Sequence, residues 1–235
     1  MWSNLFVRAL LEMAEANAHR NDSLRNDIEG VLQKYDSGCL RLTDASIDRL
    51  LGIHSTAVEK QLDIGELLLR YGNHRLAKGD FSYSIIRRLY CMLQPYLEKR
   101  DTLLDLGCGY GRIAFYGGLL KKGRVVGIEI IKERAIEAER VRRQLGLRSV
   151  EIVVGDASKS VWPPCSCICL MNSVAPRVLS RIGRRIKEIA RKRKIVVASH
   201  SNSNLFFERQ VWMREIGTKP SRWTFDLRLF ESMPC

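Results

Sequence analysis

The chain has 235 residues, of which 46% are hydrophobic, so it is long enough for one α/β domain with a small additional part. No apolar stretch approaches the ~20 residues that a membrane-spanning helix needs, which excludes an integral membrane protein of that kind. Seven cysteines without a disulfide framework, and acidic residues Glu12 and Glu15 where an import peptide would be basic, favour a cytoplasmic location.

The net charge of +13 is distributed unevenly along the chain. Residues 1–70 contain 8 Lys and Arg against 11 Asp and Glu, whereas residues 71–235 contain 31 against 15. A positive field of this size attracts anionic partners. We therefore expect a macromolecular partner or substrate: a protein, a nucleoprotein or a nucleic acid.

Helical spacing of apolar residues dominates the first 70 residues. It predicts helices over about residues 3–18, 21–35, 43–52 and 56–72, and Thr56 with Glu59 has the spacing of a capping box at the start of the last one. The sequence thus predicts a helical N-terminal cap, residues 1–70, ahead of a second domain, residues 71–235. Whether the cap is a substrate-selecting lid or a structural covering of one sheet edge stays open.

A strand, a glycine turn and a helix follow one another after a predicted helix over about residues 80–93. Residues 102–106 are an apolar strand, and Gly107, Gly109 and Gly111 come directly behind it. Dinucleotide-binding turns have the spacing G-x-G-x-x-G, but here Arg112 stands at the third glycine position. With Asp105 just before the turn, this pattern favours a ligand with a cationic amino-acid end over a diphosphate.

Three further predicted strands also end in polar residues. The strand over residues 125–129 ends at Glu129, the strand over 150–154 precedes Asp156, and the strand over 167–171 precedes Asn172. The carboxyl ends of parallel strands form the ligand crevice of an open α/β sheet, so we expect these side chains to converge.

The rest of the chain completes the predicted sheet. A basic helix spans about residues 181–194, a fifth strand about 194–199, and an antiparallel pair residues 211–216 and 223–231. The expected architecture is α/β, a seven-stranded, mostly parallel, doubly wound sheet with one antiparallel strand, preceded by a small all-helical cap. The basic end of the helix should lie away from the crevice, whereas Arg75, Lys78 and Arg112 are better placed to meet an acceptor.

Three motifs, Asp105 to Gly111 (DLGCGYG), Gly127 to Glu129 (GIE) and Gly155 to Ala157 (GDA), resemble those of the class I S-adenosylmethionine-dependent methyltransferases, over about residues 80–231. The resemblance implies methyl transfer with S-adenosyl-L-methionine as cofactor and no metal. A Rossmann-like domain for nicotinamide or flavin is the alternative. The residues that the resemblance places on the cofactor are Gly107, Cys108, Gly109 and Gly111 at the methionine part, Asp105 supporting their loop, Glu129 at the ribose, and Asp156 with Ala157 at the adenine.

The segment after the fourth strand bears on the acceptor. Asn172 is followed by Ser-Val-Ala-Pro, without the Pro-Pro-aromatic sequence of adenine and glutamine amide methylases and without the Pro-Cys pair of cytosine carbon methylases. A weaker resemblance links the chain to the non-SET lysine methyltransferases of the disruptor-of-telomeric-silencing type and their bacterial relatives. It is carried by Tyr71-Gly72, Gly127-Ile128-Glu129 and Asn172.

This second resemblance implies N-methylation of a protein lysine, with Asn172 on the cofactor or the amine and Tyr71 closing over the cofactor. Small-molecule or nucleic-acid methylation, and a catalytically inactive fold that binds cofactor or partner, remain as alternatives. A positive catalytic domain favours the macromolecular acceptor.

Overall fold

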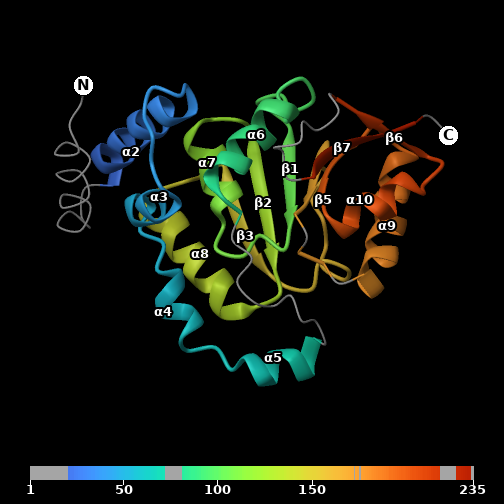
Figure 1. Ribbon diagram of the computed structural model, residues 1–235, viewed down its shortest axis with the longest axis horizontal. Helices are drawn as coiled ribbons and strands as arrows, with labels where there is room; N and C mark the ends of the chain where they lie inside the picture. The colour runs from blue at the N-terminus through green and yellow to red at the C-terminus, as the bar shows by residue number, and fades with distance from the viewer. Residues whose placement is uncertain (1–20, 72–80, 172, 175, 218–225, 234–235) are drawn as a thin grey trace.

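The computed structural model describes residues 21–71, 81–171, 173–174, 176–217 and 226–233, and it consists of a central sheet with helices on both faces and a helical part at one side (Figure 1). The predicted first helix, residues 3–18, lies outside the described residues. The described portion of the helical part contains α2 (Asn21–Asp36), α3 (Asp44–Leu51), α4 (Ser55–Glu59) and α5 (Ile64–Tyr71).

Local signals explain where these helices begin and end. The Thr43 hydroxyl accepts a hydrogen bond from the Ser46 amide at 3.1 Å and starts α3, which Gly52 ends with φ of 75°. The single helix predicted from Thr56 is wrong, because the chain forms two short helices and Asp63 accepts from the Glu66 amide at 2.9 Å ahead of the second. Glu59 does not complete a capping box, since long-range partners hold its carboxylate, as described below.

The described residues form a seven-stranded sheet in the order β3-β2-β1-β4-β5-β7-β6. Strand β7 is antiparallel to both β5 and β6, and the remaining neighbours are parallel, which confirms the predicted fold class. The strand order reverses between β1 and β4, the point at which open α/β sheets bind their ligands. The strands are β1 (Thr102–Leu106), β2 (Arg124–Glu129), β3 (Val150–Val154), β4 (Cys167–Leu170), β5 (Val196–His200), β6 (Met213–Ile216) and β7 (Leu227–Ser232).

Two apolar clusters lie on the two faces of the sheet. Helices α6 (Tyr83–Leu93), α7 (Arg112–Leu119) and α8 (Lys132–Gln144) contribute to the cluster that includes Leu103 and Val125. Helices α9 (Pro176–Ala190) and α10 (Asn202–Glu208) contribute to the cluster that includes Leu104 and Val126. Because successive strand residues point to opposite faces, each of these central strands supplies both clusters. Helix α10 was not predicted from the sequence.

The cap shares its core with the methyltransferase-like part of the chain. Buried residues of α2 and α3, such as Ile28 and Ile47, belong to the same cluster as Tyr83 of α6 and Phe115 of α7. The cap therefore packs on the helices of one face rather than along a bare sheet edge. We retain the division at residue 70 as a proposal about sequence organisation.

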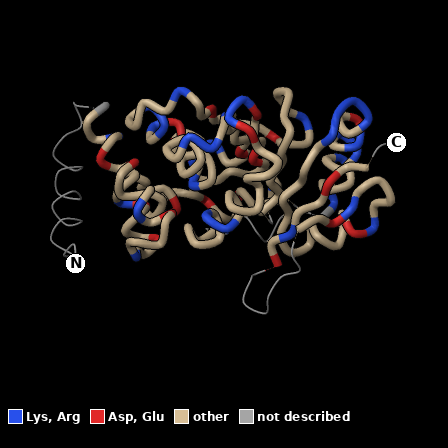
Figure 2. Tube along the Cα trace, turned by 90° about the horizontal axis from the view of Figure 1, so that it is seen from above, with Lys and Arg blue, Asp and Glu red and all other residues tan. Residues whose placement is uncertain are grey.

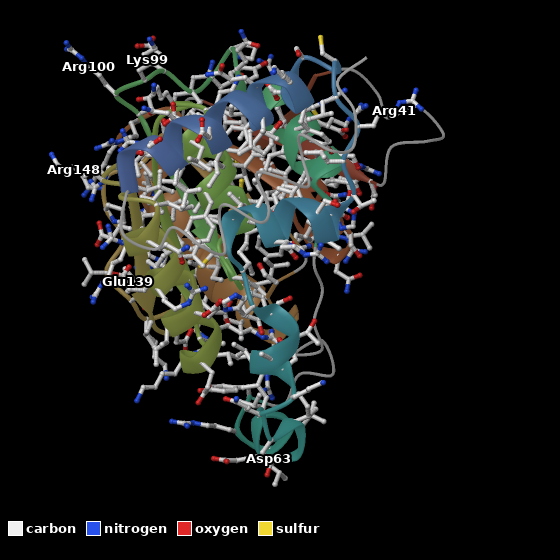
Figure 3. The ribbon with its side chains drawn as sticks, turned by 90° about the vertical axis from the view of Figure 1, so that its left-hand side faces the viewer. Arg41, Asp63, Lys99, Arg100, Glu139 and Arg148 are labelled. Atoms are coloured by element: carbon white, nitrogen blue, oxygen red, sulfur yellow. The ribbon has the colours of Figure 1, made fainter. Side chains whose placement is uncertain are left out.

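The end of the cap reaches the carboxyl ends of the strands. Lys99 and Arg100, which lie shortly before β1, are at the opposite end of the molecule from Asp63, which immediately precedes α5 (Figure 3). Figure 1 likewise places α5 beyond the strand ends that lead into α7 and α8. Within the described ranges, no helix combines the length and apolar character that a bilayer crossing requires.

Cys165, Cys167 and Cys169 are buried free thiols beside or within β4. Burial raises the pKa of Cys165 to about 11 and that of Cys167 to about 12, so both remain protonated at neutral pH. Cys167 donates to the Tyr96 carbonyl oxygen, with a sulfur-to-oxygen distance of 3.4 Å. These thiols act as small apolar side chains of the core.

Candidate functional site

The glycine turn connects β1 to α7 at the carboxyl edge of the sheet. The Gly107 and Cys108 amides both donate to the Ile128 carbonyl at the end of β2, at 2.7 and 3.2 Å. The Gly111 amide donates to the Cys108 carbonyl at 2.9 Å, which closes the turn before α7 begins. These bonds hold the loop against the neighbouring strand, so the turn is a fixed surface rather than a loose connection.

The three glycines have positive φ but different surroundings. A Cβ at Gly107 would lie 2.3 Å from the Ser173 Cβ, and a Cβ at Gly111 would lie 2.8 Å from the Phe115 ring. A Cβ at Gly109, where φ is +54°, would meet no described heavy atom within 4 Å. Packing thus explains the glycines at 107 and 111, whereas Gly109 exposes backbone against which a ligand can lie.

Glu129 ends β2 and directs its carboxylate at the glycine loop. One oxygen accepts from the Gly109 amide at 2.8 Å and the other from the Ile131 amide at 2.9 Å. The residue is 5% exposed, and burial raises its pKa, although these backbone amides and the charge of Arg134 oppose that shift. Glu129, the residue predicted to bind the ribose, therefore lies beside the loop and fixes Gly109.

Asp105 lies in β1, two residues before Gly107, and is 2% exposed. Among the described residues, no donor lies within hydrogen-bond distance of its Oδ2. Burial, with a further contribution from the negative charge of Glu129, raises the pKa of Asp105 from 3.8 to about 7. A buried carboxylate of this kind is suited to a cationic ligand group, whose charge would offset the cost of burial.

Asp156 follows β3 and organises the turn behind it. Its Oδ1 accepts from the Ser158 amide at 2.8 Å and from the Ser158 hydroxyl at 2.7 Å. Burial alone would raise its pKa, but these bonds and the nearby Lys159 and Arg181 charges outweigh burial, so the pKa is lowered and the carboxylate stays ionised. A charged acceptor at this edge can take an exocyclic amine from a purine, which is the role predicted for it.

The carbonyl of Ala157, the next residue, is engaged by side chains of the protein. Its carbonyl accepts from the Trp162 indole at 2.9 Å and from Arg185 at 2.8 Å, and the Arg185 guanidinium lies 4.0 Å from the Trp162 ring centroid. These contacts fix the turn after β3 against α9. The Ala157 side chain is partly buried against the apolar cluster of that face, and its contact with an adenine stays a prediction.

Of the two predicted catalytic residues, Asn172 and Tyr71, the structure describes only Tyr71. Asn172 lies outside the described residues, as do Arg75 and Lys78. Tyr71 ends α5 at the carboxyl edge, where its carbonyl accepts from Arg177 at the start of α9 and the Arg70 guanidinium lies 5.5 Å from its ring centroid. The role of Tyr71 stays a prediction.

Arg112 does not face an acceptor, and that prediction is wrong. The residue is 9% exposed, its Nε donates to Asp48 of α3 at 2.8 Å, and a second nitrogen donates to the same carboxylate. Its third nitrogen donates to the Phe81 carbonyl at 3.2 Å. A buried guanidinium must be paired to offset its desolvation, and the cap supplies the partner.

Sequence reasoning missed two features at this edge. Glu59 of the cap contacts both Tyr110 of the glycine loop and Arg134 of α8. His200 ends β5, and its ring meets that of Phe81 edge-on with 4.9 Å between centroids, which places an imidazole at the same strand edge. Both arrangements join segments that are far apart in the chain, so no local residue spacing predicts them.

Comparisons with known proteins agree with this geometry. A family described as methyltransferase domain matches residues 97–164, which contain β1, the glycine loop, β2 and β3. Over 65 residues the chain is 38% identical to protein-L-isoaspartate O-methyltransferase 2 of Archaeoglobus fulgidus, covering 27% of this chain and 30% of that protein. It is 30% identical over 95 residues to an uncharacterised RNA methyltransferase of Halalkalibacterium halodurans, covering 34% and 20%. The chain thus spans less than a third of either relative.

A solved structure of a mutant of MtNAS in complex with S-adenosylmethionine shares the fold with a TM-score of 0.50, at 14% identity, over 97% of this chain and 96% of that one. The chain therefore has the fold of the class I S-adenosylmethionine-dependent methyltransferases. The methyltransferase domain family matches residues 97–164 of this fold. The accessible Gly109 and the unpartnered Asp105 oxygen of the described structure fit the cationic amino-acid end of S-adenosylmethionine.

Proposed function

We propose that this chain binds S-adenosylmethionine at the carboxyl edge of β1 to β4 and transfers its methyl group to an amine of a macromolecule. The observation that carries the proposal is the combination of Gly109 and Asp105: within the described residues, an open backbone surface lies in the same loop region as a buried carboxylate oxygen without a donor. Both residues lie inside the matched methyltransferase domain. The domain match supports transferase chemistry over the binding of a nicotinamide or flavin.

Each residue has a defined part in this proposal. The glycine loop and Asp105 bind the methionine end, Glu129 binds the ribose while fixing Gly109, and Asp156 with Ala157 binds the adenine. The sulfonium supplies an activated methyl group, and its displacement is in line, so the protein contributes alignment and exclusion of water. Asn172, two residues after the end of β4, is the residue we assign to the amine or to the amino-acid end of the cofactor.

For the acceptor, we propose a protein lysine, supported by the Tyr71-Gly72 and Asn172 pattern and by the position of Tyr71 at the strand edge. The relatives include both a protein and an RNA methyltransferase, so the acceptor class rests on this chain's own residues. A lysine must be neutral to attack, because a protonated amine has no free lone pair. The free cysteines among the described residues support a reducing, cytoplasmic setting.

The basic residues support attraction to an anionic partner, and two groups of them in the described part of the chain lie away from the proposed active edge. Lys99 and Arg100 precede β1, and residues 191–194 precede β5, so both groups lie toward the amino ends of the strands. Figure 2, viewed from above Figure 1, shows Lys and Arg spread over much of that side. We therefore assign these charges to long-range attraction of a partner, which depends on ionic strength.

Transfer of a radiolabelled methyl group tests the acceptor. Protein, RNA and small amines are offered to the full chain with labelled S-adenosylmethionine at low and at high salt. The expected result is label in protein that is recovered as methylated lysine after acid hydrolysis and that decreases at high salt. Label confined to small amines without salt dependence refutes the macromolecular acceptor, and label in RNA moves the acceptor to nucleic acid.

A catalytically inactive fold is the second candidate function. It predicts cofactor binding without label in any acceptor, whereas the enzyme predicts both. The same assay with S-adenosylhomocysteine formation as readout separates the two, because transfer to any acceptor releases this product.

A further inference from the structure

Glu59, at the end of α4 in the cap, holds two residues that border the proposed cofactor site. Its Oε1 accepts from the Tyr110 hydroxyl at 2.6 Å and from Arg134 Nε at 2.8 Å, and its Oε2 accepts from a second Arg134 nitrogen at 3.1 Å. The Glu59 and Arg134 side chains are 17% and 9% exposed. A carboxylate in a paired, largely desolvated geometry of this kind makes strong, directional bonds.

Both partners of Glu59 lead to the cofactor-binding backbone. Tyr110 lies between Gly109 and Gly111, and its hydroxyl gives the cap carboxylate a direct bond to the glycine loop. Arg134 lies in the first turn of α8, and its positive charge is one of the groups that oppose the rise that burial causes in the pKa of Glu129. Glu129 in turn accepts from the Gly109 amide at 2.8 Å.

These contacts form a connected route from the cap to the loop. Glu59 accepts two hydrogen bonds from Arg134, the positive charge of Arg134 stabilises the ionised form of Glu129, and Glu129 fixes Gly109. Through Tyr110, Glu59 also restrains the next residue of the loop directly. The two routes meet at the dipeptide Gly109-Tyr110, which includes the open part of the glycine turn.

A second set of contacts attaches the cap to α8 without involving the glycine loop. Glu137 of α8 accepts from the His54 amide at 2.7 Å and from Arg140, which itself donates to the Gly52 carbonyl. Glu137 is 7% exposed, so its contacts with the cap are buried. These bonds lead to the cap and to α8 itself rather than to the glycine loop, which makes Glu137 a matched control.

We propose that Glu59 is a positioning residue for the cofactor, and that the cap sets the glycine loop and Glu129 in their binding geometry through Tyr110 and Arg134. The proposal rests on the proposed function, because it assigns a cap residue to the same cofactor site. It gives the N-terminal cap a role beyond covering one face of the sheet.

The test measures S-adenosylmethionine affinity by calorimetric titration in the full-length chain and in Glu59→Gln, Tyr110→Phe and Glu137→Gln. Glu59→Gln keeps the size and one acceptor oxygen but removes the charge, so we expect Kd to rise about ten-fold or more, a change of about 1.4 kcal/mol or above. Tyr110→Phe removes a single hydroxyl and should raise Kd by a smaller factor. Glu137→Gln should leave Kd within about two-fold of the wild type while lowering the unfolding midpoint.

A double-mutant cycle separates positioning from general loosening. Because Glu59 and Tyr110 share one hydrogen bond, their effects on Kd should fall short of additive in the double variant, whereas Glu59→Gln and Glu137→Gln should add. Turnover at saturating cofactor should change little in Glu59→Gln.

Equal affinity in wild type and Glu59→Gln, or equal losses in Glu59→Gln and Glu137→Gln, overturns the proposal. If Glu59→Gln does not fold, Tyr110→Phe provides the test in its place, and an unchanged Kd in that variant overturns the proposal. Absence of binding in the wild type contradicts the proposed function instead, so the two failures are distinguishable.

Discussion

Replacement of Gly109 by Ala separates a ligand-binding glycine from a conformational one. At φ of +54° an alanine costs about 1–2 kcal/mol of stability through its backbone alone. No described atom lies within 4 Å of the added Cβ, so the fold should bear no additional steric cost. A ligand that lies against this backbone would lose its contact, and we expect the Kd for S-adenosylmethionine to rise at least about ten-fold, or about 1.4 kcal/mol.

Gly38 provides the matched control for this variant. Its φ is +79° and its Cβ would also meet no described atom within 4 Å, but it lies after α2, far along the chain from the glycine loop. Denaturant unfolding and calorimetric titration of both alanine variants are the assay. Similar losses of stability with a loss of affinity only in Gly109→Ala are expected, and unchanged affinity in Gly109→Ala would refute the assignment of this loop.

Four other changes test the remaining residues. Glu129→Ala removes both the ribose ligand and the anchor of the loop, so Kd from the same titration should rise by roughly 30- to 1000-fold, and a smaller change than about ten-fold would count against the ribose role. In Asp105→Asn, cofactor affinity should lose its dependence on pH between about 5.5 and 7.5, whereas wild-type affinity should increase as Asp105 ionises through its raised pKa of about 7. Arg112→Ala leaves the Asp48 carboxylate buried without this partner and should lower the free energy of unfolding by about 3–5 kcal/mol, measured by urea denaturation; a change below about 1 kcal/mol would mean that water replaces the guanidinium. Asn172→Ala should reduce kcat about ten-fold or more while Kd for the cofactor changes only modestly, and a fully active variant would remove Asn172 from the mechanism.

The raised pKa of Asp105 also has a consequence for stability. In the folded chain its pKa is about 7, against 3.8 ordinarily, so the folded state binds more protons between these values. The contribution of Asp105 to stability is therefore complete below about pH 4 and is lost as pH rises through about 7. A cationic ligand reverses this preference, because it favours the ionised carboxylate.

Repeating local patterns are what made the sheet and the glycine loop predictable from the sequence. An apolar run followed at once by Gly107 predicts β1 and its turn, because only the strand-turn-helix arrangement uses both features. The polar ends of β2 and β3 converge with β1 because parallel strands share one carboxyl edge, so the sequence alone predicts that Glu129 and Asp156 lie at that edge.

Long-range pairing explains what the sequence did not predict. Arg112 was expected on the acceptor side, but its charge is matched by Asp48, which lies 64 residues earlier in the chain. Glu59 has the local spacing of a capping residue, yet its carboxylate accepts hydrogen bonds from Tyr110 and Arg134. Such pairs depend on how the cap packs against α7 and α8, and no periodicity within one segment encodes that packing.

Titration of the wild-type chain with S-adenosylmethionine tests the central claim most directly. We predict saturable, stoichiometric binding. The Gly109→Ala and Glu129→Ala variants should bind more weakly, and a dinucleotide such as NADH should not displace S-adenosylmethionine. Absence of binding, or tighter binding of the dinucleotide than of S-adenosylmethionine, would contradict the assignment of the carboxyl edge of β1 to β4 as a methyl-donor site.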